Sequence, residues 1–161
     1  MVNKISKIEK EFLRQSNKIE GVHDAKSLEQ AIYAWQHLLE RSHISSFHTC
    51  RAHKILMLYQ DLKEYEKGTY RGIPVYIAGR ECPTTYGGLN LDFAMQKWCE
   101  DADKDLENWK KHHIEFEKIH PFVDGNGRIG RMLMNWMRVK SGLPILVIKA
   151  SERQEYYKWF I

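Results

Sequence analysis

The sequence is poor in the features that would place it in several large classes of protein. It has three cysteines in 161 residues, and Cys50, Cys82 and Cys99 lack the number and spacing of a disulfide framework, a zinc site or a redox motif. No apolar run approaches the length that crosses a membrane, and the first residues have no apolar core of the signal-peptide type. We therefore expect a cytoplasmic protein with reduced cysteines and no membrane partner.

The chain also lacks internal repeats, low-complexity tracts and linkers rich in Pro, Gly or Ser. Its length is enough to bury a core, and 43% hydrophobic with 29% charged residues is typical of a globular protein. We predict one domain over residues 1–161. The formal net charge of +4 is mild, and basic residues alternate with acidic ones along most of the chain. Nucleic-acid binding is therefore not expected, and a homo-oligomer is left open.

Apolar residues recur mostly with helical spacing, which predicts a mainly α fold. A first helix should run up to Gly21, which is placed to end it. Further helices are expected over residues 26–41, from Ser45 or Ser46, over 89–100, from about 106 to 120, over 129–137 and from Ser151. After the loop 82–88, the periodicity is again helical.

One segment has a different period. Ile73, Val75 and Ile77 lie two apart within the stretch 70–79, which predicts a β-strand, and Pro74 favours an edge strand. The segment is therefore expected to form a small hairpin or flap on a helical body.

The run HPFVDGNGRIGR, which begins at His120, carries the clearest chemical pattern. Pro121 disfavours helical geometry at His120, so the preceding helix should end there. Gly125 and Gly127 allow a tight turn, and Asn126 is a good N-cap for a new helix.

Two arginines complete this pattern. Arg128 and Arg131 lie three residues apart, close enough to act on one ligand. A helix N-terminus with a glycine turn and nearby guanidinium groups is an anion site, most naturally for phosphates. An imidazole such as that of His120, with a pKa of about 6.5, can accept a proton at neutral pH.

The same run resembles the signature of the Fic (Fic/Doc) family, HPFx[D/E]GNGRxxR, and matches it at every defined position. Most members of this family transfer AMP from ATP to a hydroxyl side chain of a target protein. The resemblance implies a Fic-type helical bundle with a small β-hairpin flap. Members usually continue beyond the point at which this chain stops, so we expect a minimal or truncated domain.

The resemblance also implies a role for each motif residue. His120 would deprotonate the target hydroxyl, Asp124 would hold Mg²⁺, and ATP would be the substrate. The phosphate groups would be bound by the remaining motif residues, Gly125, Asn126, Gly127, Arg128 and Arg131. The last of these would contact the γ-phosphate. Phe122 is expected to anchor the loop in the core, and His113 to be a buried histidine rather than a zinc ligand.

Near the N-terminus, Ser16, Glu20 and Gly21 resemble the family's inhibitory motif, [S/T]xxxE[G/N]. Residues 1–21 would then form an inhibitory helix, on which Ser16 and Glu20 share a face. A Glu20 carboxylate paired with Arg131 would occupy the guanidinium that the γ-phosphate needs. We therefore expect an autoinhibited enzyme; in some family members the same glutamate also supports AMP removal.

The flap implies how a target would bind. An edge at Ile73, Val75 and Ile77 can pair with an extended target segment and align its hydroxyl with His120. Three alternatives stay open at this point: a Fic-type transferase with another phosphate donor, a de-AMPylase, and a catalytically silent nucleotide-binding regulatory module. The target protein and its modified residue are not predicted.

Overall fold

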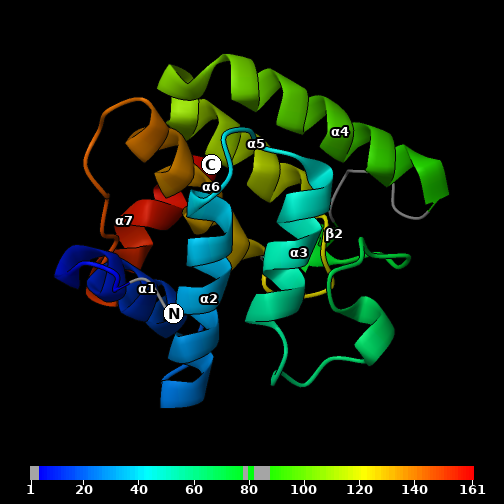
Figure 1. The fold of residues 1–161 in the computed structure, drawn as a ribbon. Coiled ribbons are helices and arrows are strands. Elements are labelled where there is room, and N and C mark those ends of the chain that lie inside the picture. Colours follow the sequence, from blue (N-terminus) through cyan, green and yellow to red (C-terminus); the bar gives the residue numbers. More distant parts are fainter. Residues whose placement is uncertain (1–3, 78–79, 82–87) are drawn as a thin grey trace.

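A computed structural model describes residues 4–77, 80–81 and 88–161 and confirms the predicted mainly helical fold (Figure 1). In chain order the α-helices are α1 (Lys7–Ile19), α2 (Ala25–Leu39), α3 (Ser46–Leu56), α4 (Gly88–Lys104), α5 (Trp109–Ile119), α6 (Asn126–Lys140) and α7 (Arg153–Tyr157). Short 3-10 helices lie at Glu64–Glu66, Leu106–Asn108, Ala150–Glu152 and Lys158–Phe160. No helix in these described ranges is long and apolar enough to cross a membrane. The cytoplasmic location stays a prediction.

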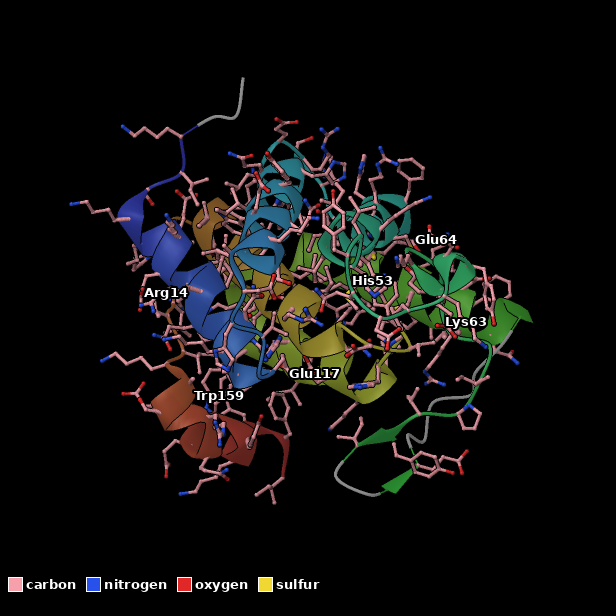
Figure 2. All side chains as sticks on the ribbon, turned by 90° about the horizontal axis from the view of Figure 1, so that it is seen from below. Arg14, His53, Lys63, Glu64, Glu117 and Trp159 are labelled. Carbon is pink, nitrogen blue, oxygen red and sulfur yellow. The ribbon has the colours of Figure 1, made fainter. Side chains whose placement is uncertain are left out.

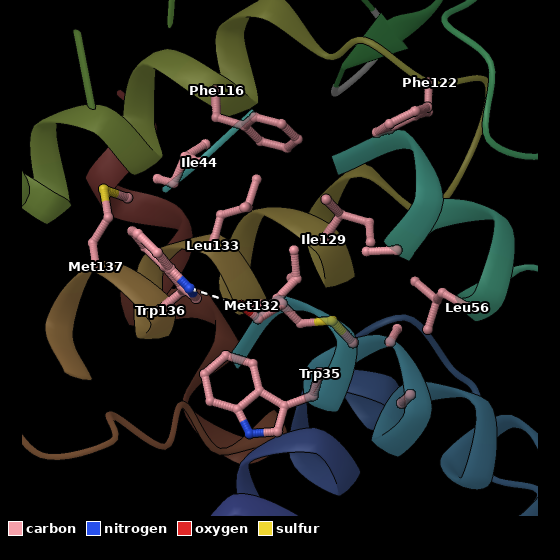
Figure 3. Close-up of a cluster of buried hydrophobic side chains, with 14 of the residues drawn as sticks. Trp35, Ile44, Leu56, Phe116, Phe122, Ile129, Met132, Leu133, Trp136 and Met137 are labelled. Carbon is pink, nitrogen blue, oxygen red and sulfur yellow. Dashed lines mark hydrogen bonds between the residues drawn. The ribbon is translucent and has the colours of Figure 1, made fainter. Parts of the chain in front are cut away.

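Helix α6 runs through the centre of the molecule and is buried along most of its length. The side chains of Ile129, Leu133 and Trp136 are at most 2% exposed, and Figure 3 shows them among residues from α2, α3 and α5. The indole Nε1–H of Trp136 donates to the Leu38 carbonyl at 2.9 Å, so its burial leaves no polar atom unpaired. Because α6 is held by neighbours on several sides, its N-terminus is a fixed point.

Helix α1 begins and ends with specific capping contacts. Ser6 and Glu9 form a capping box at its start. At its end Gly21 has a φ of 71°, and the N–H groups of Gly21 and Val22 donate to the carbonyls of Lys18 and Asn17. This is a Schellman motif, which needs a residue that tolerates the left-handed conformation. The predicted role of Gly21 in ending the helix is confirmed, and the motif fixes the direction of the preceding Glu20.

The C-terminal helical segment packs against α1 and α6. Its Tyr156 is 4% exposed and shares a small cluster with Ile19 and Met134, with Trp159 packed alongside. The backbone N–H of Ala150 donates to Gln15 Oε1 at 2.9 Å. These contacts join both terminal segments to one side of α6, as Figure 1 shows for α1 and α7.

The flap differs from its prediction. The regular strand β1 covers only Tyr76–Ile77, paired antiparallel with β2 (Arg80–Glu81), and the hairpin projects from the helical body (Figure 2). The stretch before β1 is not a strand because Pro74 has no N–H to donate and the Ile73 carbonyl accepts from Arg71 instead. The rest of the predicted strand, 78–79, and residues 82–87 of the predicted loop lie outside the described residues.

Candidate active site

The loop between α5 and α6 is held in place by its own side chains. The Asn126 amide accepts from the Phe122 N–H and donates to the Phe122 carbonyl, both at 2.8 Å. Phe122 is fully buried and stacks on the His53 ring with centroids 3.8 Å apart. The predicted anchoring of Phe122 in the core is confirmed.

Asn126 itself departs from its prediction. The N-cap of α6 is Gly125, which has a φ of 84°, and Asn126 is the first residue of the helix. The buried Asn126 amide is bound to Phe122 and so does not cap the helix. Its local preference for the N-cap position is overridden because both Phe122 backbone groups would otherwise be buried without partners.

His53 is a site residue that the sequence did not indicate. Its Nε2–H donates to the Asp124 carbonyl at 2.8 Å, and its Nδ1 accepts from the Gly68 N–H at 2.9 Å. Nδ1 can accept only in the neutral ring, and burial lowers the pKa of His53 to about 4. His53 thus supports the loop from α3 as an uncharged group. Its place in the apolar stripe of α3, three residues from Cys50 and from Leu56, was the available signal.

His120 lies just beyond the last residue of α5 in a left-handed conformation, with φ 49° and ψ 62°. Its Nδ1 lies 3.2 Å from the Glu117 carbonyl, which can only accept, so Nδ1 carries the ring proton and Nε2 keeps its lone pair. Burial lowers the pKa of His120, partly offset by this hydrogen bond. The ring is therefore neutral and able to take a proton at neutral pH.

Arg71 holds this strained residue and is the second site residue that the sequence missed. Its guanidinium donates to three backbone carbonyls, those of His120 at 2.6 Å, Ile119 at 3.1 Å and Ile73 at 3.1 Å. Its own N–H donates to the Pro121 carbonyl at 2.8 Å. Arg71 therefore joins the end of α5 to the base of the flap. No local pattern marks an arginine that binds carbonyls about 50 residues further along the chain.

Arg128 provides buried cationic donors at the N-terminus of α6. The side chain is 2% exposed, and its Nε and Nη1 have no hydrogen-bond partner in the part of the chain that the structure describes. Burial lowers the pKa of Arg128, and the negative charge of Asp124 offsets only part of this decrease. The first N–H groups of α6 lie at the same helix end and have no intrahelical acceptor. A buried guanidinium without an acceptor is costly, so this end of α6 is suited to bind an anion.

Asp124 lies next to these donors with an open carboxylate. Its side chain is 64% exposed, Oδ2 is 3.8 Å from Arg128 Nη2, and Oδ1 accepts from the Gly125 N–H at 2.7 Å. The described residues contain no group of three or more metal-binding side chains. One exposed carboxylate beside a candidate anion site nevertheless fits Mg²⁺, which typically uses one or two carboxylates together with phosphate oxygens and water.

Arg131 contacts both residues of the N-terminal motif. Its Nε donates to Ser16 Oγ at 2.8 Å, and its Nη2 donates to the Ser16 carbonyl at 3.1 Å and to Glu20 Oε1 at 2.6 Å. The predicted pairing of Glu20 with Arg131 is thus present. Burial alone would lower the pKa of Arg131, but Tyr156 and Glu20 raise it overall.

Glu20 also lies directly over the first turn of α6. A Cβ added at Gly127 would be 2.4 Å from Glu20 Oε1 and 2.9 Å from Arg131 Nη1. A carboxylate at the C-cap of α1 is unfavourable for the dipole of that helix, but the N-terminus of α6 and Arg131 offset this cost. The carboxylate thus occupies the position at which a helix N-terminus binds an anion.

On the other side, Arg131 is tied to the C-terminal segment. Its Nη1 donates to the Tyr156 hydroxyl at 3.4 Å, which in turn donates to His113 Nε2 at 2.8 Å, while His113 Nδ1–H donates to the Gly130 carbonyl at 3.1 Å. Burial lowers the pKa of His113 to about 3. His113 is a fully paired core residue, in line with its prediction.

The fold therefore brings the residues of the central and N-terminal motifs close together, but not all of the flap residues. His120, Asp124, Arg128, Arg131 and Glu20 surround the N-terminus of α6. Of the flap residues, Ile73 is connected to the site through Arg71, and its side chain is 50% exposed. Ile77 lies in β1 and Val75 directly before it, in the hairpin that projects from the helical body in Figure 2.

The chain also matches a family of known proteins. A model of the Fic/DOC family matches residues 43–137. A relative named "Protein adenylyltransferase Fic" from Nematostella vectensis is 31% identical over 98 residues, which are 58% of this chain and 23% of the relative. This chain thus corresponds to less than a quarter of that relative's length.

Two solved structures have a similar fold. A Fic-domain signalling protein from Bacteroides thetaiotaomicron matches with a TM-score of 0.79 and 18% identity, over 94% of this chain and 70% of that one. BepC from Bartonella tribocorum, solved with bound AMPPNP, matches with a TM-score of 0.50 and 16% identity, over 78% of this chain and 69% of that one. At these identities the two likenesses bear on the fold alone.

Proposed function

Because the chain belongs to the Fic/DOC family, we propose that it is an autoinhibited protein adenylyltransferase. It transfers AMP from ATP to a Ser, Thr or Tyr hydroxyl of a target protein and releases pyrophosphate. Relatives named protein adenylyltransferase support this reaction and an adenine nucleotide as its donor. The observation that carries the proposal is Arg128, a buried cation whose Nε and Nη1 lack partners among the described residues.

In the proposed reaction His120 acts as the base. Nε2 takes the proton of the target hydroxyl, the hydroxyl oxygen attacks the α-phosphorus, and the bond from that phosphorus to the pyrophosphate oxygen breaks. The N–H groups at the start of α6 and the Arg128 guanidinium stabilise the charge on the phosphate oxygens. Asp124 would hold Mg²⁺, which when bound neutralises phosphate charge.

Autoinhibition follows from competition for Arg131. The γ-phosphate of ATP needs a cation at this end of α6, and Arg131 is already bound by Ser16 and Glu20. ATP that binds beside an intact Glu20–Arg131 pair would have its α-phosphate displaced from in-line attack, and a small displacement lowers the rate strongly. Replacement of Glu20 is therefore expected to activate the enzyme.

The hairpin is the proposed docking site of the target. Strand β1 is paired with β2 along one edge. The exposed Ile77 lies in β1, and the exposed Ile73 lies three residues before it begins. An extended target segment that adds to the free edge would be positioned relative to His120 through Arg71, which binds both the flap base and the loop.

The proposal is tested with ATP labelled separately at its α- and γ-phosphates. We expect the Glu20→Gly protein to transfer the α-label to protein in lysate, with an AMP adduct in mass spectra, and the wild-type protein to transfer little. Glu40→Gly is the matched control, because Glu40 is also a helix C-cap, that of α2, and forms its ion pair with Arg41 instead of Arg131. His120→Ala in the Glu20→Gly protein should abolish labelling.

Other outcomes separate the alternatives. Transfer of the γ-label alone would overturn adenylylation in favour of kinase-like chemistry. ATP binding without labelling in all variants would favour a catalytically silent nucleotide-binding module. Equal labelling by wild-type and Glu20→Gly proteins would contradict the autoinhibition.

A further inference from the structure

Glu117, which is labelled in Figure 2, places a carboxyl group close to His120 and to Gly130 of α6. It lies on the last turn of α5, and its Oε2 is 3.8 Å from His120 Nδ1. The side chain is 15% exposed, while Oε1 is fully buried and has no hydrogen-bond partner among the described residues. The transfer reaction proposed for this site uses no group of Glu117.

Helix α6 makes room for this carboxyl group at Gly130. A Cβ there would be 2.4 Å from Glu117 Oε1 and 3.0 Å from Phe116 Cδ1, so any larger residue would collide with the carboxyl group. A buried carboxylate is costly unless a cation or hydrogen-bond donors stabilise it. The unpaired Oε1 therefore indicates that Glu117 acts on a neighbour rather than contributing stability.

The charged and titratable groups around Glu117 come from four helices. They are His113 on α5 and His120 at its C-cap, Arg131 on α6, Glu20 at the C-cap of α1 and Tyr156 on α7. Arg131 directs its hydrogen bonds to Ser16, Glu20 and Tyr156, and His113 is fully paired. His120 is thus the neighbour whose charge changes when it takes a proton.

We propose that Glu117 is a positioning residue that holds His120 in its Nδ1–H form and stabilises the imidazolium produced during AMP transfer. The inference rests on the proposed function. The target O–H bond breaks and a bond from Nε2 to that proton forms. Nδ1–H stays on the ring, between the Glu117 carbonyl and carboxylate. The pair then carries opposite charges 3.8 Å apart in a buried setting, where such attraction is strong.

The role requires an ionised carboxylate. Burial raises the pKa of Glu117 to about 7, although the positive charge of Arg131 acts to lower it. AMP transfer should therefore decrease as the pH falls through about 7, because a protonated Glu117 no longer stabilises the imidazolium.

The first test follows the His120 ring by NMR in the wild-type chain, with its signals assigned from the His120→Asn spectrum. Between about pH 5 and about pH 9 we expect the His120 shifts to move in two steps, one from its own titration and one from Glu117. In Glu117→Gln the step from Glu117 should vanish. The same single step in both proteins would overturn the proposal.

The second test measures AMP transfer in the Glu20→Gly background. We expect Glu117→Gln to lower kcat about tenfold or more, with little change in KM for ATP, and to remove the acid limb near neutral pH. Glu117→Asp should restore part of kcat because it restores the charge. Glu115→Gln, on an exposed part of the same helix, is the matched control.

The two measurements separate this inference from the proposed function. No AMP transfer by Glu20→Gly protein would overturn the function, whereas the two-step titration of His120 would still support the pair. An unchanged kcat and acid limb in Glu117→Gln, with active Glu20→Gly protein, would overturn the role of Glu117 alone.

Discussion

The guanidinium of Arg71 binds the carbonyl of His120 at 2.6 Å, which joins the base of the flap to the residue proposed as the catalytic base. His120 has a positive φ, a conformation that costs a non-glycine residue about 1 kcal/mol or more. Arg71 offsets this cost with charge-assisted bonds to His120 and Ile119. The direction of the imidazole thus depends on a residue outside the central motif.

The Arg71→Lys substitution should impair both stability and catalysis. A lysine keeps the charge but lacks the planar fork that binds several carbonyls. We expect the free energy of unfolding to fall by about 2 kcal/mol. In the Glu20→Gly background, the single-turnover rate of AMP transfer should fall about a hundredfold through misplacement of His120.

Arg51→Lys is the control for this substitution, because Arg51 is exposed on α3. Urea unfolding and labelling with α-labelled ATP measure the two effects. An Arg71→Lys protein with the wild-type labelling rate would show that Arg71 does not orient His120.

Ser16→Ala should activate the enzyme less than Glu20→Gly does. The change removes the acceptor of Arg131 Nε but leaves the Ser16 carbonyl and Glu20 in contact with the guanidinium. A hydrogen bond to a charged group is worth about 1.5–3 kcal/mol, so we expect labelling to rise about tenfold. Initial rates with α-labelled ATP give the comparison.

Ser6→Ala separates this effect from a general loosening of α1. Ser6 caps the same helix, and its loss should cost about 1 kcal/mol of helix stability without activation. Equal activation by both alanine variants would mean that the Arg131 contact is not what restrains the enzyme.

Tyr156→Phe should weaken the support of Arg131 from the C-terminal side. The hydroxyl joins Arg131 Nη1 to His113 Nε2, so its removal leaves a buried ring nitrogen without a donor. We expect the free energy of unfolding to fall by about 1–2 kcal/mol, measured by urea titration. Tyr157→Phe, with a 41% exposed side chain on the same helix, should change it little. Equal losses in both proteins would contradict the role of the Tyr156 hydroxyl.

The sequence predicted the parts of the site that are encoded locally. Helical periodicity indicated α5 and α6, Pro121 indicated the end of α5, and Gly21 indicated the end of α1. The contact between Glu20 and Arg131 spans 111 residues. It was predicted only because the Ser16 to Gly21 stretch resembles a known inhibitory motif.

Two of the missed features, His53 and Arg71, depend on contacts between distant segments. His53 binds a carbonyl 71 residues away, and Arg71 binds one 49 residues away. The spacing of His53 in α3 indicates a buried residue but not this partner, and Arg71 has no pattern in its neighbours. The alternation at Ile73–Ile77 overpredicted the strand because Pro74 lacks a donor. At Asn126, hydrogen bonds to the backbone of Phe122, four residues earlier in the preceding loop, outweighed the capping preference.

The two buried neutral histidines should make stability depend on pH. Burial lowers the pKa of His53 to about 4 and that of His113 to about 3. The unfolded chain, with histidine pKa values of about 6.5, therefore binds more protons than the folded chain below that pH. Their contribution to stability is complete above about pH 6.5 and is lost as the pH falls toward the folded pKa values.

From about pH 7.5 to about pH 5 each histidine should reduce the free energy of unfolding by about 2 kcal/mol. Glu117 acts in the opposite direction, because burial raises its folded pKa to about 7 and the folded state then binds the extra proton. The wild-type loss should be smaller than the sum of the two histidines, and Glu117→Gln should show the steeper fall.

Urea unfolding at a series of pH values measures these slopes. His53→Gln should be less stable at neutral pH, since it loses the stacked ring, but its stability should depend less on pH. His43→Gln is the control, because the His43 side chain is 77% exposed and should leave most of the slope intact. If the free energy of unfolding depended on pH in the same way in the wild-type, His53→Gln and His43→Gln proteins, the lowered pKa of the buried His53 ring would be contradicted.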